Sequence, residues 1–122
     1  MKKRILSLLV VFVFIIALMT GCSNKGTNIT VEVTHADQSV KTFEYTTEAE
    51  MLGEVLLDEG LVEGYDSDYG LVIEKVDGEQ AIYETDGAYW SLLIDGEYAQ
   101  TGADSTPVED GVTYSLVYTL EN

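Results

Sequence analysis

The sequence predicts an α+β domain in which one helix packs on one face of a mixed sheet of four to five strands, preceded by a signal peptide. Three observations carry this prediction. The chain opens with basic residues and an apolar run that ends just before a cysteine. Beyond it, apolar and polar residues alternate in several short runs, as in half-buried strands. One segment, at 47–60, has helical spacing instead.

The N-terminal segment is typical of a bacterial lipoprotein signal. Basic residues at 2–4 precede an apolar run at 5–19, which is shorter than the roughly 20 residues that a membrane-spanning helix needs. Small residues, among them Gly21, stand before Cys22, the single cysteine of the chain. A plain signal peptide, or a retained anchor helix with an incidental cysteine, is the alternative.

Cleavage at this point divides the chain into three parts. We expect residues 1–21 to be removed, residues 22–28 to form a lipidated tether, and residues 29–122 to form the domain. Acyl chains on Cys22 would hold the protein on the outer side of the cell membrane, because each buried methylene contributes about 0.8 kcal/mol.

The charge of the chain excludes one class of partner. It has 22 acidic residues against 6 basic ones, and its net charge is −16. All the acidic residues follow Cys22, where the basic ones are Lys25, Lys41 and Lys75. Such a surface repels nucleic acid. With one cysteine, the domain has no internal disulfide, so packing alone must hold it together.

The elements of the first half follow from local patterns. Residues 29–34 alternate as a strand, 36–39 form a turn, and 40–45 return as the second strand of a hairpin. Thr47 and Glu50 have the spacing of a capping box, so we expect a helix to begin there. Its buried stripe consists of Leu52, Val55 and Leu56. Gly60 suits the left-handed position that ends a helix.

The second half consists of short strands separated by turns. An acidic loop is expected at 61–69. Strands are expected at 71–76, 81–83, 89–94, 97–99 and 112–120, with the strand at 89–94 buried on both faces. A lone helix after a hairpin must cover the sheet. This order gives the β-grasp arrangement, with the first and last strands side by side in the middle of the sheet.

Enzyme chemistry has little support, and we predict no catalytic residues. His35, the only histidine, is expected to be a solvated residue beside a turn. No phosphate-binding glycine loop or zinc-protease motif is present in the sequence. Asp66 and Asp68 precede Gly70 as in calcium loops, but Asp77 stands where such loops have glutamate, so an ordinary acidic loop is the default. We therefore predict no metal or cofactor.

The aromatic residues are more informative. Tyr65 and Tyr69 flank the acidic loop, and Tyr89 and Trp90 lie near the end of a strand, as do Tyr83 and Tyr98. Tyrosine and tryptophan offer flat apolar area with a polar group, which suits a planar ligand or a protein partner. Packing in the core is the stronger interpretation for Trp90, whereas both interpretations stand for the loop tyrosines.

The segments Tyr89-Trp90-Ser91-Leu92-Leu93, 102–107 and Asp110-Gly111 occur in an order that resembles the C-terminal β-domain of transcobalamin and intrinsic factor. Bacterial lipoproteins with a transcobalamin-like C-terminal domain look similar too. The resemblance covers roughly 29–120 and implies a β-grasp fold of the ligand-binding kind. In the vitamin carriers this domain closes over one face of cobalamin while a large helical domain holds the other.

What the resemblance implies is a binding module, with cobalamin or another corrinoid as the favoured ligand. The residues expected to contact it are Tyr89, Trp90, Gln100, Gly102, Ala103 and Asp104, with Tyr65 and Tyr69 added from the aromatic pattern. The module would capture a soluble ligand and pass it to a membrane transporter. The alternative is an adhesion or assembly module that binds a surface protein or wall component through a sheet edge.

Overall fold

The computed structural model describes residues 26–121, which form two sheets and one main helix. The five-stranded sheet has the order β2-β1-β8-β6-β7, and the three-stranded sheet has the order β3-β4-β5. The predicted signal at 1–21 and the lipid site at Cys22 lie outside the described residues. Within 26–121, no helix has the length and apolarity of a membrane span.

The elements have the following bounds. The larger sheet contains β1 (Thr27–Thr34), β2 (Val40–Thr47), β6 (Ala88–Ile94), β7 (Glu97–Tyr98) and β8 (Thr113–Leu120). The smaller sheet contains β3 (Val62–Ser67), β4 (Gly70–Val76) and β5 (Glu79–Gln80). The helices are α2 (Leu52–Asp58), the short α3 (Tyr83–Asp86) and the 3-10 turn η2 (Ala103–Ser105).

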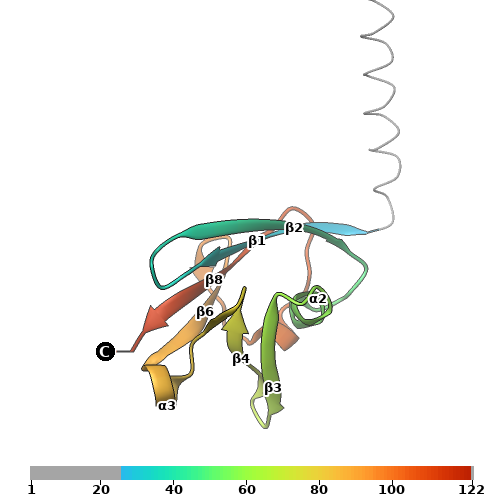
Figure 1. Ribbon diagram of the computed structural model, residues 1–122. Coiled ribbons are helices and arrows are strands. Elements are labelled where there is room, and N and C mark those ends of the chain that lie inside the picture. The colour runs from blue at the N-terminus through green and yellow to red at the C-terminus, as the bar shows by residue number, and fades with distance from the viewer. Residues whose placement is uncertain (1–25, 122) are drawn as a thin grey trace, which may run out of the picture.

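The first and last strands lie side by side in the middle of the larger sheet, as predicted (Figure 1). They are parallel, with Val31 opposite Tyr114 and Val33 opposite Leu116. The other pairs in this sheet are antiparallel. This mixed sheet with one main helix confirms the predicted α+β, β-grasp-like fold.

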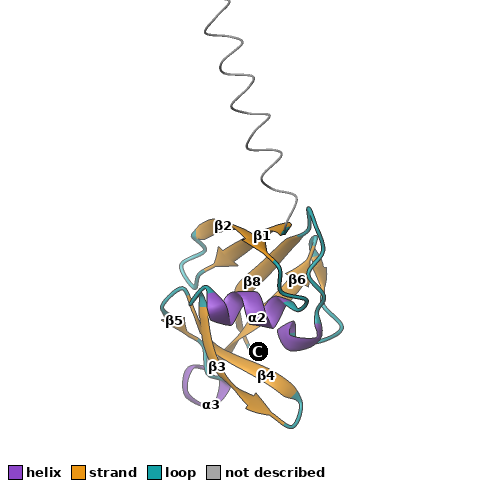
Figure 2. Ribbon diagram, turned by 90° about the vertical axis from the view of Figure 1, so that its right-hand side faces the viewer, coloured by secondary structure: helices purple, strands orange, loops and turns teal. Residues whose placement is uncertain are grey.

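Helix α2 covers one face of the larger sheet, where Figure 2 shows it crossing in front of the strands. The predicted stripe is buried, with Leu52 and Leu56 at 0% exposure and Val55 at 2%. It shares one core with the inward-facing residues of β1 and β8. The helix ends at Asp58, and Gly60, just beyond the C-cap, has the predicted left-handed conformation, with a φ of 72° that favours glycine. Burial of this stripe joins the helix to the sheet.

The predicted capping box is wrong, because the helix begins five residues later, at Leu52. Thr47 is the last residue of β2, and its hydroxyl accepts a hydrogen bond from the Ala49 N–H at 3.0 Å. Met51 precedes the helix and gives it no side-chain cap. Instead, the Leu52 N–H donates to the Thr106 carbonyl oxygen at 2.8 Å. A backbone carbonyl far along the chain therefore replaces the side-chain cap and satisfies the first N–H of the helix.

Three further expectations are corrected. The acidic segment at 61–69 is no loop, because β3 forms there and pairs antiparallel with β4 in a hairpin, with an irregularity after Glu63. The short strand expected at 81–83 is replaced by β5 before it and by α3, which begins at Tyr83. Strand β6 is not buried on both faces, since Tyr89 is 41% exposed.

Two neighbouring leucines test the packing of the helix. Leu56→Ala removes a side chain at 0% exposure and should lower the free energy of unfolding by about 2–5 kcal/mol, because it leaves a cavity. Leu57→Ala, at a position 45% exposed, should cost less than about 0.5 kcal/mol. Urea unfolding followed by circular dichroism measures both. Equal losses in the two variants would contradict this packing.

Candidate functional site

Three exposed tyrosines meet at one cavity between the two sheets. Tyr65 comes from β3, Tyr83 from α3 and Tyr89 from β6, and the cavity measures about 140 Å³. Their exposed fractions are 53%, 57% and 41%. The remaining lining residues are Val72, Ile73, Glu74, Ala81, Ile82 and Glu84. Two of the residues predicted from sequence, Tyr65 and Tyr89, are thus brought together.

Local structure explains why these side chains converge. Tyr65 stands opposite Val72 in the β3–β4 hairpin. The α3 turn is held by the Asp86 carboxylate, which accepts a hydrogen bond from the Ile82 N–H at 2.9 Å. Gly87 follows in the left-handed region, with φ of 64°, and turns the chain into β6.

The edge of β6 beside Tyr89 has no strand next to it in the described part of the chain. β7 is only two residues long and pairs with Leu93 and Ile94 at the other end of β6. Tyr65 of the smaller sheet and Tyr89 of β6 line the same cavity, so the smaller sheet lies beside this unpaired stretch of β6. A ligand in the cavity would lie at this junction of the two sheets.

Trp90 lies in the core rather than at the cavity. It is 9% exposed, and its ring packs edge to face with Tyr118 at 5.6 Å and with His35 at 6.2 Å between ring centroids. Its buried Nε1 has no hydrogen-bond partner among the described residues. Tyr69, at the turn between β3 and β4, is 99% exposed and does not line the cavity.

The segment expected to contact a ligand at 100–104 packs elsewhere. Ala103 is buried, and the backbone of Asp104 lies against Gly53 of α2 so closely that a Cβ at Gly53 would come within 3.1 Å of it. Gly102 accepts a hydrogen bond from the Thr106 hydroxyl at 2.8 Å. Gln100 is exposed. This segment supports the helix and does not line the cavity that contains Tyr89.

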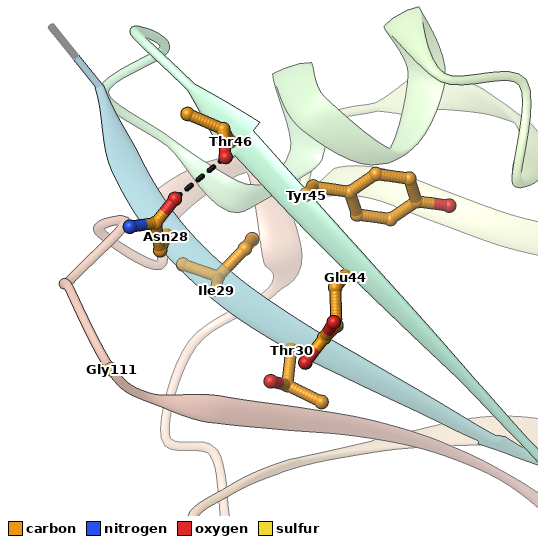
Figure 3. Close-up of a pocket in the computed structure, with 7 residues that line it drawn as sticks. All are labelled: Asn28, Ile29, Thr30, Glu44, Tyr45, Thr46 and Gly111. Atoms are coloured by element: carbon orange, nitrogen blue, oxygen red, sulfur yellow. Dashed lines mark hydrogen bonds between the residues drawn. The ribbon is translucent and has the colours of Figure 1, made fainter. Parts of the chain in front are cut away.

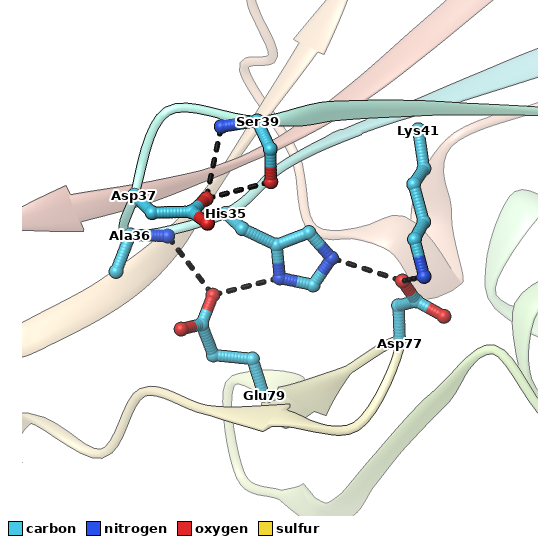
Figure 4. Close-up of polar contacts among 7 residues, drawn as sticks. All are labelled: His35, Ala36, Asp37, Ser39, Lys41, Asp77 and Glu79. Carbon is cyan, nitrogen blue, oxygen red and sulfur yellow. Dashed lines mark hydrogen bonds and ion pairs between the residues drawn. The ribbon is translucent and has the colours of Figure 1, made fainter.

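His35 is not a solvated turn residue, because its side chain is only 13% exposed and bridges the two sheets (Figure 4). Its Nε2 lies 2.9 Å from Asp77 Oδ2, and its Nδ1 lies 2.8 Å from Glu79 Oε1. Lys41 Nζ lies 3.1 Å from the same Asp77 oxygen. We call these four residues the His35 clamp. It joins the β1–β2 hairpin to the turn between β4 and β5.

The charges of the clamp support one another. Both ring nitrogens face a carboxylate, and only the protonated imidazole donates from both. The hydrogen bond to Asp77, with a smaller effect of Glu79, raises the pKa of His35 above its usual 6.5, although burial opposes the shift. The hydrogen bond from His35, with help from Lys41, lowers the pKa of Asp77 below its usual 3.8.

Two other hollows are larger but carry fewer aromatic groups. One of about 300 Å³ lies between the start of β1, β2 and Gly111, with Glu44 as its one charged residue (Figure 3). Another of about 620 Å³ lies beside His35, Tyr118 and Leu120. Both ring nitrogens of His35 are already bonded to Asp77 and Glu79, so neither is available to a ligand in this hollow. Within residues 26–121, no group of three or more histidine, cysteine or acidic side chains is arranged to hold a metal ion.

Sequence patterns alone did not indicate Glu74 and Glu84 as site residues. Glu74 lies in a segment whose pattern predicts an ordinary strand, and Glu84 lies in a short helix that the sequence pattern does not indicate. The only signal for either was its nearness to an aromatic residue, such as Tyr83. In a chain with 22 acidic residues, that signal does not select any one carboxylate.

Comparisons with known proteins give a family and a fold. Residues 50–115 match the family described as a domain of unknown function (DUF4430). A crystal structure from Ruminococcus gnavus ATCC 29149, described as "a putative metal binding protein", is 42% identical, has a TM-score of 0.75, and is matched over 79% of this chain and 99% of that one. Among curated proteins, no sequence matches.

A second solved structure, haptocorrin in complex with Cbi, has the same fold at 17% identity and a TM-score of 0.59. The match covers 79% of this chain and 25% of that chain, so this protein spans about a quarter of haptocorrin's length. At this identity the likeness shows the fold alone. It agrees with the transcobalamin-like fold expected from the sequence.

The His35 clamp predicts a pH dependence of stability. A group whose pKa is raised on folding stabilises the fold fully below its unfolded pKa, and this contribution is lost as the pH rises through the folded value. The free energy of unfolding should therefore fall as the pH rises from about 5.5 to 8.5. His35→Gln should flatten this slope, as measured by urea unfolding at each pH. An unchanged slope would contradict the clamp.

Proposed function

Because the chain belongs to the DUF4430 family and shares the fold of a haptocorrin domain, we propose that it is a lipid-anchored surface module that binds a small organic ligand without catalysis. The observation that carries this proposal is the cavity where Tyr65, Tyr83 and Tyr89 meet. A corrinoid is the favoured ligand, by family resemblance.

The cavity has the chemistry of a binding site for an organic molecule. Its tyrosines offer apolar ring area and a hydroxyl each. Within residues 26–121, Tyr114 is the tyrosine whose hydroxyl forms hydrogen bonds to protein atoms. The hydroxyls of the three cavity tyrosines form none there and can bond to a ligand. Val72, Ile73 and Ile82 are half-buried beside them and add apolar surface. Such a mixture binds by stacking and a few directed hydrogen bonds.

The size of the cavity limits what it holds alone. Pockets that enclose a drug-sized ligand measure roughly 300–1,000 Å³, whereas this one measures about 140 Å³. A corrinoid would therefore place only part of its surface here and would need a second surface for tight binding. A membrane transporter or another surface protein is the partner that we propose for that role.

A second candidate function is adhesion or assembly through a sheet edge. Among residues 26–121, strand β2 lies at the end of the larger sheet and pairs with β1 alone, and Val40 at its start is 55% exposed. An unpaired edge of this length accepts another strand. This candidate stands in place of the first if small ligands do not bind the cavity.

Titration with cobinamide and cobalamin tests the ligand. The lipid-free domain suffices, because the Ruminococcus relative is a solved chain matched over 99% of its length. Calorimetry should show binding at micromolar to millimolar ligand, and Tyr89→Ala should weaken it about tenfold or more. Tyr69→Ala is the matched control, because that ring is 99% exposed and outside the cavity. No heat with either ligand, or equal losses in both variants, would refute the corrinoid assignment.

Replacement of the lipid site tests the anchor. Cys22→Ser removes the thiol that would carry the acyl chains. The lipid-modified form should therefore disappear from the membrane fraction, and the protein should be found unprocessed or in the soluble fraction. Cell fractionation with mass spectrometry of the N-terminus measures this change. Recovery of the unaltered protein with residues 1–21 attached would contradict the proposed processing.

A further inference from the structure

We infer that the tyrosine cavity selects a ligand that presents a positively charged group, with a small quaternary ammonium as the simplest example. This inference rests on the proposed function and narrows it, because it specifies the charge of the group that enters. It is carried by the two glutamates and three tyrosines that line one cavity, Glu74, Glu84, Tyr65, Tyr83 and Tyr89.

The two glutamates that line the cavity have no basic partner in the part of the chain that the structure describes. Neither Glu74 nor Glu84 forms an ion pair within residues 26–121. No lysine or arginine lines the cavity. An anionic ligand would meet two uncompensated negative charges there, and a positively charged one would be attracted by both.

The basic groups of the described chain are engaged elsewhere. Lys41 and His35 are held by Asp77, at 3.1 Å and 2.9 Å. Lys75 Nζ lies 3.7 Å from Glu63 Oε2. No protein cation within residues 26–121 is therefore placed to neutralise the cavity, and the net charge of −16 adds a field that attracts positive ligands.

The tyrosines favour the same charge. The face of an aromatic ring is negative, and a cation placed over it within about 6 Å is stabilised. An ammonium group surrounded by methyl groups also gains from the apolar surface of Val72 and Ile82. A hydrated metal ion gains less, because it holds its water more strongly. The combination therefore fits an organic cation better than an inorganic one.

The volume fits a headgroup of this kind. A cavity of about 140 Å³ offers the space of roughly five water molecules at about 30 Å³ each. That space accommodates a trimethylammonium group, whereas a large ring system would extend beyond it. A bigger ligand would therefore place its charged end in the cavity and leave the rest at the junction of the two sheets.

Two probes of nearly equal shape test the inference. Choline carries a quaternary nitrogen, and 3,3-dimethylbutan-1-ol replaces it with a neutral carbon. Calorimetry or saturation-transfer NMR on the lipid-free domain should give choline at least about tenfold tighter binding. The preference should fall to about threefold or less in the Glu74→Gln/Glu84→Gln double variant. Glu97→Gln, at an exposed position outside the cavity, should keep it.

The outcomes separate this inference from the proposed function. Equal affinity for the two probes, lost in Tyr89→Ala, would overturn the charge selectivity and keep the cavity as a binding site. No binding of choline up to tens of millimolar, with corrinoid binding retained, would have the same meaning. No binding of any probe would overturn both. A choline preference that also weakens as salt rises from about 20 to 500 mM would support the inference.

Discussion

The contact between helix α2 and the five-stranded sheet is the constraint on which the rest of the molecule depends. The single cysteine leaves no internal disulfide, so burial of this helix must hold the parallel pair β1 and β8 in place. The smaller sheet follows directly from the helix. Leu61 and Val62 are buried, and the Asp77 N–H donates to the Leu61 carbonyl oxygen at 2.8 Å. The helix therefore positions both sheets, and the junction between them.

The junction between the two sheets contains the cavity proposed as the binding site. The His35 clamp fixes the turn between β4 and β5 against the β1–β2 hairpin, and β4 in turn carries Val72 to Glu74 to the cavity. Acidic residues take part in both places. Asp77 and Glu79 form the ion pairs of the clamp, and Glu74 and Glu84 line the cavity beside the tyrosines. Basic side chains compensate Asp77 and Glu79 of the clamp, whereas Glu74 and Glu84 of the cavity have no basic partner within residues 26–121. The proposed preference of the cavity for positively charged groups depends on this difference.

Sequence patterns predicted the features that depend on residues close together in the chain. The alternation in β1 and β8, the stripe of α2 and the glycine at its end each follow from neighbouring residues. The helix start did not, because the Leu52 N–H is satisfied by Thr106, far along the chain. The role of His35 was missed for the same reason, since its partners are 42 and 44 residues away. Strand β3 was missed because most of its residues are exposed, which leaves no buried face to recognise. The meeting of Tyr65 with Tyr89 depends on how two sheets pack, and no spacing in the sequence encodes it.

The most direct test of a ligand site at the junction is amide chemical-shift mapping by NMR, with the lipid-free domain titrated with cobinamide and with choline. The largest shifts should occur at Tyr65, Tyr83 and Tyr89 and at their neighbours in the cavity, with β2 unaffected. Shifts confined to β2, or to the hollow beside Gly111, would place binding elsewhere and contradict a ligand site at the junction.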